Sequence, residues 1–217
     1  MPYQSNSDNN TETVDVRKQN LRRQVRALRA AMSEAQRAAA ASRICNHLQQ
    51  IITRLRMKQK LDSEFVVAVY LAKREEVCLD DLVLTLLEQG VPIVAPVGGA
   101  PSDAPFYRLH NLTDGITIGS FDVREPMQYA EEMAFSPAQV QLVLAPGLAF
   151  DRQGGRLGYG GGWYDQILGE VPCSIGVCFD CQLVGEVPCK PHDRRVGAIV
   201  TETQTIITGV STQLLEF

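Results

Sequence analysis

The stretch Phe65–Tyr70 limits the possible folds more than any other part of the chain, because all six of its residues are apolar. A strand with one face in water alternates apolar and polar residues, whereas a strand inside a parallel sheet is covered on both faces. A helical pattern follows over Leu79–Gln89 and ends at Gly90, and Val91–Ala95 supplies a second strand. This order of strand, helix and strand predicts a βαβ unit.

The alternation continues in the second half of the chain. Apolar strand patterns occur at Val140–Ala145, Ser174–Phe179 and Ala198–Thr201, and a helix is predicted to begin near Trp163. The sequence therefore predicts an α/β fold in which helices sandwich a mostly parallel sheet. Residues 96–139 carry little periodic signal, with short strand-like pieces at 106–109 and 116–123.

Two helices are predicted to open the fold. Apolar residues recur at helical spacing from Arg17 to about Met32, and an Ala-rich stretch continues to about Leu55. Ser33 and Gln36 begin this second helix with a capping-box pattern. Residues 1–15 are polar and acidic, without the basic and apolar regions of a signal peptide. We therefore predict a disordered N-terminal extension over 1–15, a single domain over 16–217 and a cytoplasmic location.

The charges are distributed unevenly along the chain. Residues 1–60 contain 12 Lys and Arg against 4 Asp and Glu, a net charge of +8, whereas residues 61–217 contain 9 against 21, a net charge of −12. The formal net charge of −4 for all 217 residues hides this difference. A basic segment can bind nucleic acid, an acidic membrane surface or a phosphate-bearing ligand. No apolar run approaches the roughly 18 residues that a membrane span requires, so no transmembrane helix is expected.

Several of the six cysteines cluster near the end of the chain, which raises the question of a zinc site. Cys178 and Cys181 have the two-residue gap of a zinc knuckle, and Cys173, Cys189 and His192 lie nearby. No second pair with this gap accompanies them, and Cys178 falls within a predicted buried strand. We therefore favour buried, reduced thiols over a metal site.

A glycine-rich loop follows the predicted strand at 140–145. Glycines at positions 158, 160, 161 and 162 let backbone N–H groups approach an anion, and the next helix directs its positive end toward the same place. Arg156 can add charge, Trp163 and Tyr164 can stack on a flat ring, and Asp165 can ligate the magnesium that accompanies a nucleotide. The glycine spacing fits neither a Walker A loop nor a Rossmann loop.

The alternative interpretation of this loop is structural. Glycines also permit a tight turn, and the two aromatic residues and the aspartate could serve as core anchors and a helix cap. The coincidence of four glycines, an arginine, two aromatic residues and an acid at one strand–helix junction favours a ligand site.

The loop resembles the hallmark segment of the 5-formyltetrahydrofolate cyclo-ligases, also called methenyltetrahydrofolate synthetases. Pro146–Asp151 and Arg156–Asp165 carry the main match. The other matching positions, in the family's order, are Lys18, Arg22, Tyr70–Leu71, Glu76–Val77, Gln182–Val184, Pro188, His192–Asp193 and Val200–Glu202. The resemblance therefore runs from about Lys18 to Glu202.

The resemblance implies a NagB/RpiA/CoA-transferase-like fold and a catalytic domain over 16–217. The reaction that it implies is the ATP- and Mg²⁺-dependent closure of 5-formyltetrahydrofolate to 5,10-methenyltetrahydrofolate, with release of ADP and phosphate. The expected partners are ATP and this folate, with or without a polyglutamate tail, and neither nucleic acid nor a membrane. We expect a monomer.

Site residues are implied by position. ATP would contact Lys18, Arg22, Arg156, Leu157, Gly158, Tyr159, Gly160, Gly161, Gly162, Trp163 and Tyr164. The folate would contact Leu71, Glu76 and the loop residues Tyr159, Gly160, Gly161, Gly162 and Trp163, and magnesium would be bound by Asp165 and Asp193. Tyr159 departs from the basic or small polar residue that relatives often carry, and Trp163 from the usual Tyr or Phe. The family pattern assigns nothing to residues 96–139.

These residue types suit the chemistry. Phosphorylation of the formyl oxygen creates a leaving group that N10 can displace, and phosphoryl transfer needs positioning and charge neutralisation more than a covalent nucleophile. Lysine, arginine, backbone N–H groups and magnesium supply these. Glu76 is the candidate for holding the formamide and N10 region and for accepting a proton.

Two alternatives belong to other functional classes. A nucleic-acid-binding protein would use the basic helices, but the part with net charge −12 would repel a polyanion and the first helix lacks interleaved aromatic residues. A non-catalytic folate or nucleotide binder would keep the fold without the reaction. The charged residues retained at 18, 22, 156, 165 and 193 favour the enzyme.

Overall fold

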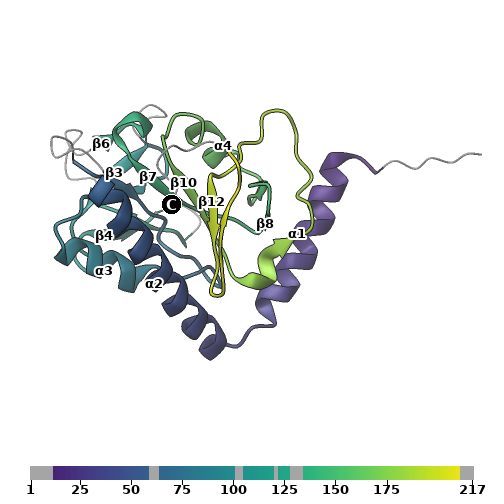
Figure 1. Cartoon of the computed structure of the whole chain (residues 1–217), viewed down its shortest axis with the longest axis horizontal. Coiled ribbons are helices and arrows are strands. Elements are labelled where there is room, and N and C mark those ends of the chain that lie inside the picture. Colours follow the sequence, from purple (N-terminus) through teal and green to yellow (C-terminus); the bar gives the residue numbers. More distant parts are fainter. Residues whose placement is uncertain (1–11, 59–63, 101–104, 120–121, 128–133, 211–217) are drawn as a thin grey trace, which may run out of the picture.

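The structure is a computed structural model of the 217-residue chain, and it describes residues 12–58, 64–100, 105–119, 122–127 and 134–210. Within these residues an eight-stranded sheet forms the centre of the molecule (Figure 1). Its strands, in order across the sheet, are β13 (Thr205–Ile207), β12 (Ala198–Val200), β10 (Ser174–Val177), β7 (Leu142–Pro146), β1 (Val67–Ala68), β2 (Ile93–Pro96), β3 (Phe106–Leu109) and β6 (Ala134–Phe135). The strands from β12 to β2 run parallel, and antiparallel strands lie at both edges. The predicted α/β fold with a mostly parallel sheet is confirmed.

The apolar stretch Phe65–Tyr70 lies at the middle of this sheet. Regular pairing is confined to β1, where Val67 is opposite Ile93 on one side and Leu142 on the other. All residues of the stretch are buried, because strands cover both edges and other elements cover both faces. This arrangement explains the lack of polar alternation.

Helices cover both faces of the sheet. α2 (Glu34–Lys58) and α3 (Asp80–Glu88) bury their apolar residues in one cluster with one face, and the short α4 (Trp163–Ile167) packs on the other face. The capping box of α2 is present, because the Gln36 N–H donates to Ser33 Oγ (3.2 Å) and the Ser33 N–H donates to Gln36 Oε1 (2.8 Å). The two central helices therefore follow the predicted pattern.

α1 (Val14–Ala30) packs away from the central sheet, along the side of the molecule (Figure 1). Its partner is a small second sheet with strand order β11 (Leu183–Val184), β8 (Ala149–Asp151) and β9 (Arg156–Leu157). A small cluster of buried residues, namely Val25, Ala149, Leu157 and Val187, joins helix and sheet. The short 3₁₀-helix η4 (Asp180–Gln182) also contacts α1. The sequence analysis did not predict this second sheet.

The first helix begins earlier than predicted. Thr13 is its N-cap and accepts a hydrogen bond from the Val16 N–H (3.4 Å), and Asp15 lies in the first turn, where a carboxylate is stabilised by the helix dipole. Val14 and Asp15, assigned above to the N-terminal extension, therefore belong to α1. Residues 1–11 of that extension lie outside the described residues.

The segment after β2 also departs from the sequence analysis. The piece at 106–109 is β3, but the piece at 116–123 is a hairpin of β4 (Ile116–Ile118) and β5 (Arg124–Pro126). The chain reverses because the Gly119 N–H donates to the Val123 carbonyl (2.8 Å) and Asp122 adopts a left-handed φ of 55°. A 3₁₀-helix, η3 (Pro137–Gln139), then leads into β7.

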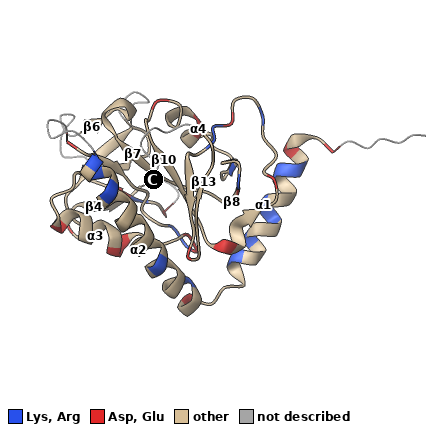
Figure 2. Ribbon diagram, viewed as in Figure 1, with Lys and Arg blue, Asp and Glu red and all other residues tan. Residues whose placement is uncertain are grey.

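Basic residues are concentrated on α1 and α2, as the charge count indicated (Figure 2). Lys18 and Arg29 are buried even though they lie on a helix at the side of the molecule. None of the helices in the described residues has the length and apolar content needed to cross a membrane.

Candidate active site

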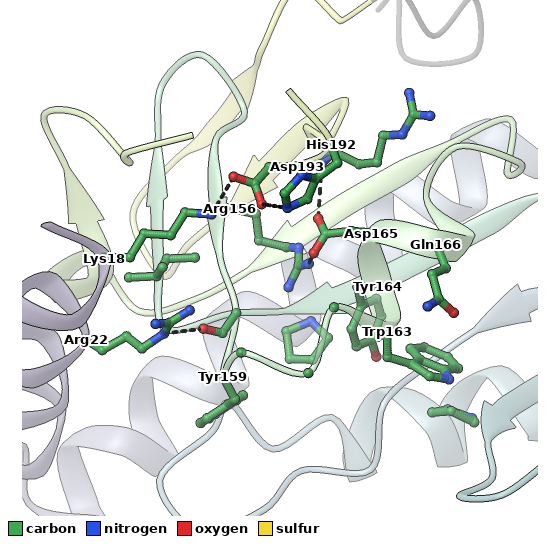
Figure 3. Close-up of a pocket in the computed structure, with 18 of the residues that line it drawn as sticks. Lys18, Arg22, Arg156, Tyr159, Trp163, Tyr164, Asp165, Gln166, His192 and Asp193 are labelled. Carbon is green, nitrogen blue, oxygen red and sulfur yellow. Dashed lines mark hydrogen bonds and ion pairs between the residues drawn. The ribbon is translucent and has the colours of Figure 1, made fainter. Parts of the chain in front are cut away.

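A pocket of about 1080 Å³ lies at the carboxyl ends of the parallel strands. Pro96 at the end of β2 and Pro146 at the end of β7 line it, which is where open α/β sheets bind ligands. Side chains from α1 form one wall, and the glycine-rich loop and the segment 190–194 complete it (Figure 3). The pocket thus joins segments from both ends of the chain.

The loop between β9 and α4 presents its backbone to this pocket. Gly160 and Gly162 have φ values of 115° and 70°, which residues with a side chain rarely adopt. Within the described residues, the N–H groups of Gly160, Gly161 and Gly162 donate no hydrogen bond, and all three residues are exposed. These donors are available to an anion, as the sequence predicted.

α1 brings two cations to the same place. The Lys18 ammonium contacts the Asp193 carboxylate, and Arg22 Nε donates to the Gly158 carbonyl (3.0 Å). Arg22 therefore ties α1 to the glycine-rich loop, and Lys18 ties it to the segment 190–194. Both arrangements depend on the packing of α1 on the small sheet, which places one face of the helix over the pocket.

Arg156 is the most buried cation of the pocket, with a side chain 4% exposed. Its guanidinium pairs with Asp165 (3.2 Å) and lies over the Tyr164 ring (5.3 Å to the centroid). Its Nε atom is buried and has no hydrogen-bond partner among the described residues. The carboxylate and the ring therefore hold the guanidinium in place at the pocket, with one donor unused.

The two aromatic residues of the loop lie on the side of the pocket opposite α1 (Figure 3). Trp163 makes edge-on contacts with Phe106 and with Tyr164, with ring centroids 5.7 Å and 4.8 Å apart. Burial raises the pKa of Tyr164 well above its ordinary value, and the Glu76 carboxylate adds to this shift. Tyr164 is therefore a neutral group, and both rings of the loop line the pocket.

Asp165 and Asp193, predicted to bind magnesium, both line the pocket and both already have partners. Asp165 accepts from the Arg194 N–H (3.0 Å) in addition to its pair with Arg156. Asp193 accepts from the Lys190 N–H (2.6 Å) and pairs with Lys18. Burial opposes ionisation of Asp193, but the Lys18 ammonium and the Lys190 N–H outweigh it and lower the pKa of this carboxyl.

This donor set fits magnesium in type. Mg²⁺ is commonly held by one or two carboxylates together with water and substrate phosphates. Asp193 Oδ1 lies 3.9 Å from His192 Nε2 and makes no hydrogen bond within the described part of the chain, so it remains available to a cation.

Glu76 lies beside the glycine-rich loop rather than on the pocket wall. It accepts hydrogen bonds from the Tyr159 hydroxyl (2.6 Å) and from the Lys73 N–H (2.9 Å). Arg29 donates to the same hydroxyl (3.1 Å), so the tyrosine joins α1 to the segment after β1. Removal of the hydroxyl from water, together with the Glu76 carboxylate, raises the pKa of Tyr159 to about 12. Leu71 is buried in the core and does not line the pocket.

The sequence analysis missed several residues of the pocket. They are Asp15, the segment 96–99, Val123, Glu125, Gln166, Lys190 and Arg194. The proline that ends β2 was a usable signal, because it follows a predicted strand at the edge where ligands bind. Glu125 lies within residues 96–139, which carry little periodic pattern, so nothing in the local sequence connects it to the pocket.

The cysteines, considered above for a zinc site, all lie within the described residues. Within the described residues, no three His, Cys, Asp or Glu side chains lie close enough together to hold a metal ion. All six cysteines are free, and burial raises the pKa of Cys173 to about 12.

Fold and pocket together define an α/β protein whose ligand site lies at the carboxyl ends of parallel strands. The model of the 5-formyltetrahydrofolate cyclo-ligase family matches residues 14–202, and the chain belongs to this family. The resemblance in the loop and in the flanking positions is thereby confirmed.

Known relatives agree with this assignment. The chain is 31% identical over 135 residues to a 5-formyltetrahydrofolate cyclo-ligase of Mycolicibacterium smegmatis, an alignment that covers 57% of this chain and 66% of the relative. It is 26% identical over 162 residues to the Escherichia coli K12 cyclo-ligase, covering 72% of this chain and 88% of the relative. The solved structure of the Aquifex aeolicus 5,10-methenyltetrahydrofolate synthetase is 26% identical, with a TM-score of 0.74 and coverage of 89% of this chain and 94% of that one. The chain thus spans just under two thirds of the first relative and most of the other two.

Proposed function

We propose that this protein catalyses the ATP- and Mg²⁺-dependent conversion of 5-formyltetrahydrofolate to 5,10-methenyltetrahydrofolate, with release of ADP and phosphate. One observation carries the proposal beyond family membership. Lys18, Arg22 and Arg156 converge with the unused N–H groups of Gly160–Gly162 on a single pocket that also holds Trp163. A pocket with anion-binding and ring-binding groups suits a nucleotide and a folate together.

The triphosphate would bind between α1 and the glycine-rich loop. Lys18 and Arg22 approach from the helix, Arg156 from β9, and the N–H groups from the loop itself. Such fixed donors stabilise the charge that develops on a transferring phosphoryl group, since they need no reorganisation during the reaction. In the absence of ligand, Lys18 and Arg156 are held in position by Asp193 and Asp165.

The reaction balances without a covalent enzyme intermediate. The formyl oxygen attacks the γ-phosphorus of ATP and releases ADP, which leaves a phosphorylated N5-iminium group. N10 then attacks the formyl carbon, loses its proton, and the carbon–oxygen bond breaks to release phosphate. The pocket contributes by aligning the two substrates and by excluding water from the activated intermediate.

Asp165 and Asp193 are the residues proposed to hold magnesium. When bound, the ion would neutralise the phosphate oxygens of ATP. Arg194 and Lys190 position these two carboxylates through their backbone N–H groups, so the orientation of both side chains is fixed before any ion arrives.

Glu76 is the proposed acceptor near N10 of the folate. Its hydrogen bond from Tyr159 connects it to the tip of the glycine-rich loop. Leu71, which is buried and does not line the pocket, is proposed as an apolar contact of the folate on the family pattern alone. The assignment of Glu76 rests on the family pattern together with its position beside the loop.

The test mixes purified protein with 5-formyltetrahydrofolate, Mg²⁺ and ATP and follows the near-ultraviolet absorbance of the methenyl product. We expect an absorbance rise that requires both ATP and Mg²⁺. Lys18→Met should raise the KM for ATP by about tenfold or more, because it removes a charge-assisted contact to phosphate. Arg43→Met, on the exposed face of α2, is the matched control.

An absorbance rise without ATP, or none at all, would reject the proposed reaction. An unchanged KM for ATP in Lys18→Met would show that Lys18, and with it α1, does not contribute to nucleotide binding. The family assignment would not be affected.

A further inference from the structure

Glu125 is an acidic residue to which the proposed reaction assigns no role. It lies in β5, its residue is 7% exposed, and it lines the pocket. Within the described residues its carboxylate makes no hydrogen bond and no ion pair. Its oxygens are not among the buried side-chain atoms that lack a hydrogen-bond partner, so they are accessible from the pocket and can accept hydrogen bonds from a ligand.

The surroundings of Glu125 are built to hold this side chain in place. Gly98 and Gly119 lie directly against the carboxylate: a Cβ atom at Gly98 would stand 2.9 Å from Glu125 Oε1, and one at Gly119 would stand 2.1 Å from Glu125 Cδ. The neighbouring Arg124 forms a two-pronged ion pair with Asp80 (2.7 and 2.8 Å), which fixes β5 to the start of α3. The carboxylate is therefore preorganised in a space that two glycines leave open.

The position of Glu125 distinguishes it from the acids beside the cations. Gly98 follows Pro96 at the end of β2, Pro96 pairs with Phe106 of β3, and Phe106 contacts the Trp163 ring. Glu125 thus belongs to the same side of the pocket as Trp163. Lys18 and Arg22 lie on the opposite side (Figure 3). A flat ring bound against Trp163 would therefore lie on the same side of the pocket as this carboxylate.

We propose that Glu125 binds the pteridine ring of the folate by accepting hydrogen bonds from its 2-amino group and its N3–H. This inference rests on the proposed function. The two donors are adjacent on one edge of the 2-amino-4-oxo ring, and a carboxylate offers two acceptors in the same plane. Adenine cannot form this pair, because the edge that carries its amino group places an acceptor beside the donor. Glu125 therefore selects the folate and orients its ring relative to N5 and N10.

The experiment compares 5-formyltetrahydrofolate with its 2-desamino-2-methyl analogue, which lacks the amino donors. Wild-type protein should prefer the natural substrate by about 10- to 100-fold in kcat/KM, the range expected for a two-pronged hydrogen-bonded contact. Glu125→Leu should bring this ratio close to one, and Glu125→Gln should give an intermediate ratio because one acceptor remains. The KM for ATP should not change in either variant.

Glu88→Gln, at the exposed end of α3, is the matched control and should behave as wild type. The melting temperature of Glu125→Gln should equal or exceed that of wild type, because the carboxylate that it replaces has no hydrogen-bond partner within the described residues.

Four outcomes would overturn the inference. They are an unchanged substrate ratio in both variants, a rise in the KM for ATP equal to that for the folate, a lower melting temperature in Glu125→Gln, and a changed Mg²⁺ requirement with an unchanged KM for the folate. Absence of turnover by the wild-type protein would reject the proposed function and this inference with it. Normal wild-type turnover with no effect of the variants would reject this inference alone.

Discussion

Charged side chains around the pocket are held in pairs or networks before any ligand binds. Lys18 and Asp193 have side chains only 11% and 12% exposed, so each depends on the other for its charge to be tolerated. The Tyr159 hydroxyl connects two charged residues, because it donates a hydrogen bond to Glu76 and accepts one from Arg29. Substitutions that remove a single polar group from one of these residues should therefore have a measurable effect on substrate binding or on stability.

Tyr159→Phe tests the connection between the loop and Glu76. The variant keeps the ring but removes the hydroxyl, so Glu76 loses one of its two hydrogen bonds. We expect the KM for 5-formyltetrahydrofolate to rise about three- to tenfold, the effect of one lost hydrogen bond to a charged group, with little change in the KM for ATP. Steady-state kinetics at varied folate and fixed ATP measures this. An unchanged KM for the folate would show that the Tyr159 hydroxyl does not contribute to folate binding.

The ion pair between Asp80 and Arg124 predicts a dependence of stability on pH. The hydrogen bond from Arg124 holds the pKa of Asp80 below its ordinary value of 3.8, although partial burial opposes this. A carboxyl whose pKa is lower in the folded state stabilises the protein above the unfolded pKa and loses this effect as the pH falls through the folded pKa.

Asp80→Asn should therefore lower the free energy of unfolding by about 1 kcal/mol at pH 7, and the difference from wild type should shrink below pH 4. Urea unfolding at pH 7 and pH 3.5 measures it. A difference that stays the same at both pH values would show that charge is not its cause.

At the scale of elements, a glycine of the central sheet takes part in the contact with the small sheet. A Cβ atom at Gly176, in β10, would stand 2.4 Å from Cε1 of Phe150, which is fully buried in β8. Because both sheets surround this ring, neither side can move without disturbing several strands. The glycine therefore allows β8 to approach the central sheet.

Gly176→Ala should lower the free energy of unfolding by about 1–3 kcal/mol, the usual effect of overpacking in a core. Gly185→Ala is the control, since a Cβ atom there has no heavy atom within 4 Å. Chemical denaturation of the two variants provides the comparison, and equal stabilities would show that Phe150 relaxes without loss.

At the scale of the whole molecule, the sequence predicted those parts of the fold whose pattern lies within a few consecutive residues. Examples are the buried stretch Phe65–Tyr70, the capping box at Ser33 and the glycine-rich loop. The small sheet could not be found in this way. Its strands are two or three residues long, and β8 and β11 are paired across more than thirty residues of sequence.

The same reasoning explains which residues of the pocket were predicted. The loop residues and Lys18, Arg22 and Asp193 belong to segments with a strong motif, and all of them line the pocket. Glu125 and Arg194 come from segments whose position is decided by packing against distant parts of the chain. Only the folded arrangement places Glu125 between Gly98 and Gly119.

The pairing of charges in the pocket has a consequence for how a nucleotide enters. Among the described residues that line the pocket, five are Lys or Arg and four are Asp or Glu, so the protein carries its own counter-ions. A free triphosphate would have to displace carboxylates from Lys18 and Arg156 and leave them unneutralised. Under the proposed function, a triphosphate that arrives with a divalent cation would exchange partners instead, with Lys18 and Arg156 pairing with phosphate and Asp165 and Asp193 holding the cation. The affinities for the two components would then be thermodynamically linked, and each would strengthen the binding of the other by the same factor.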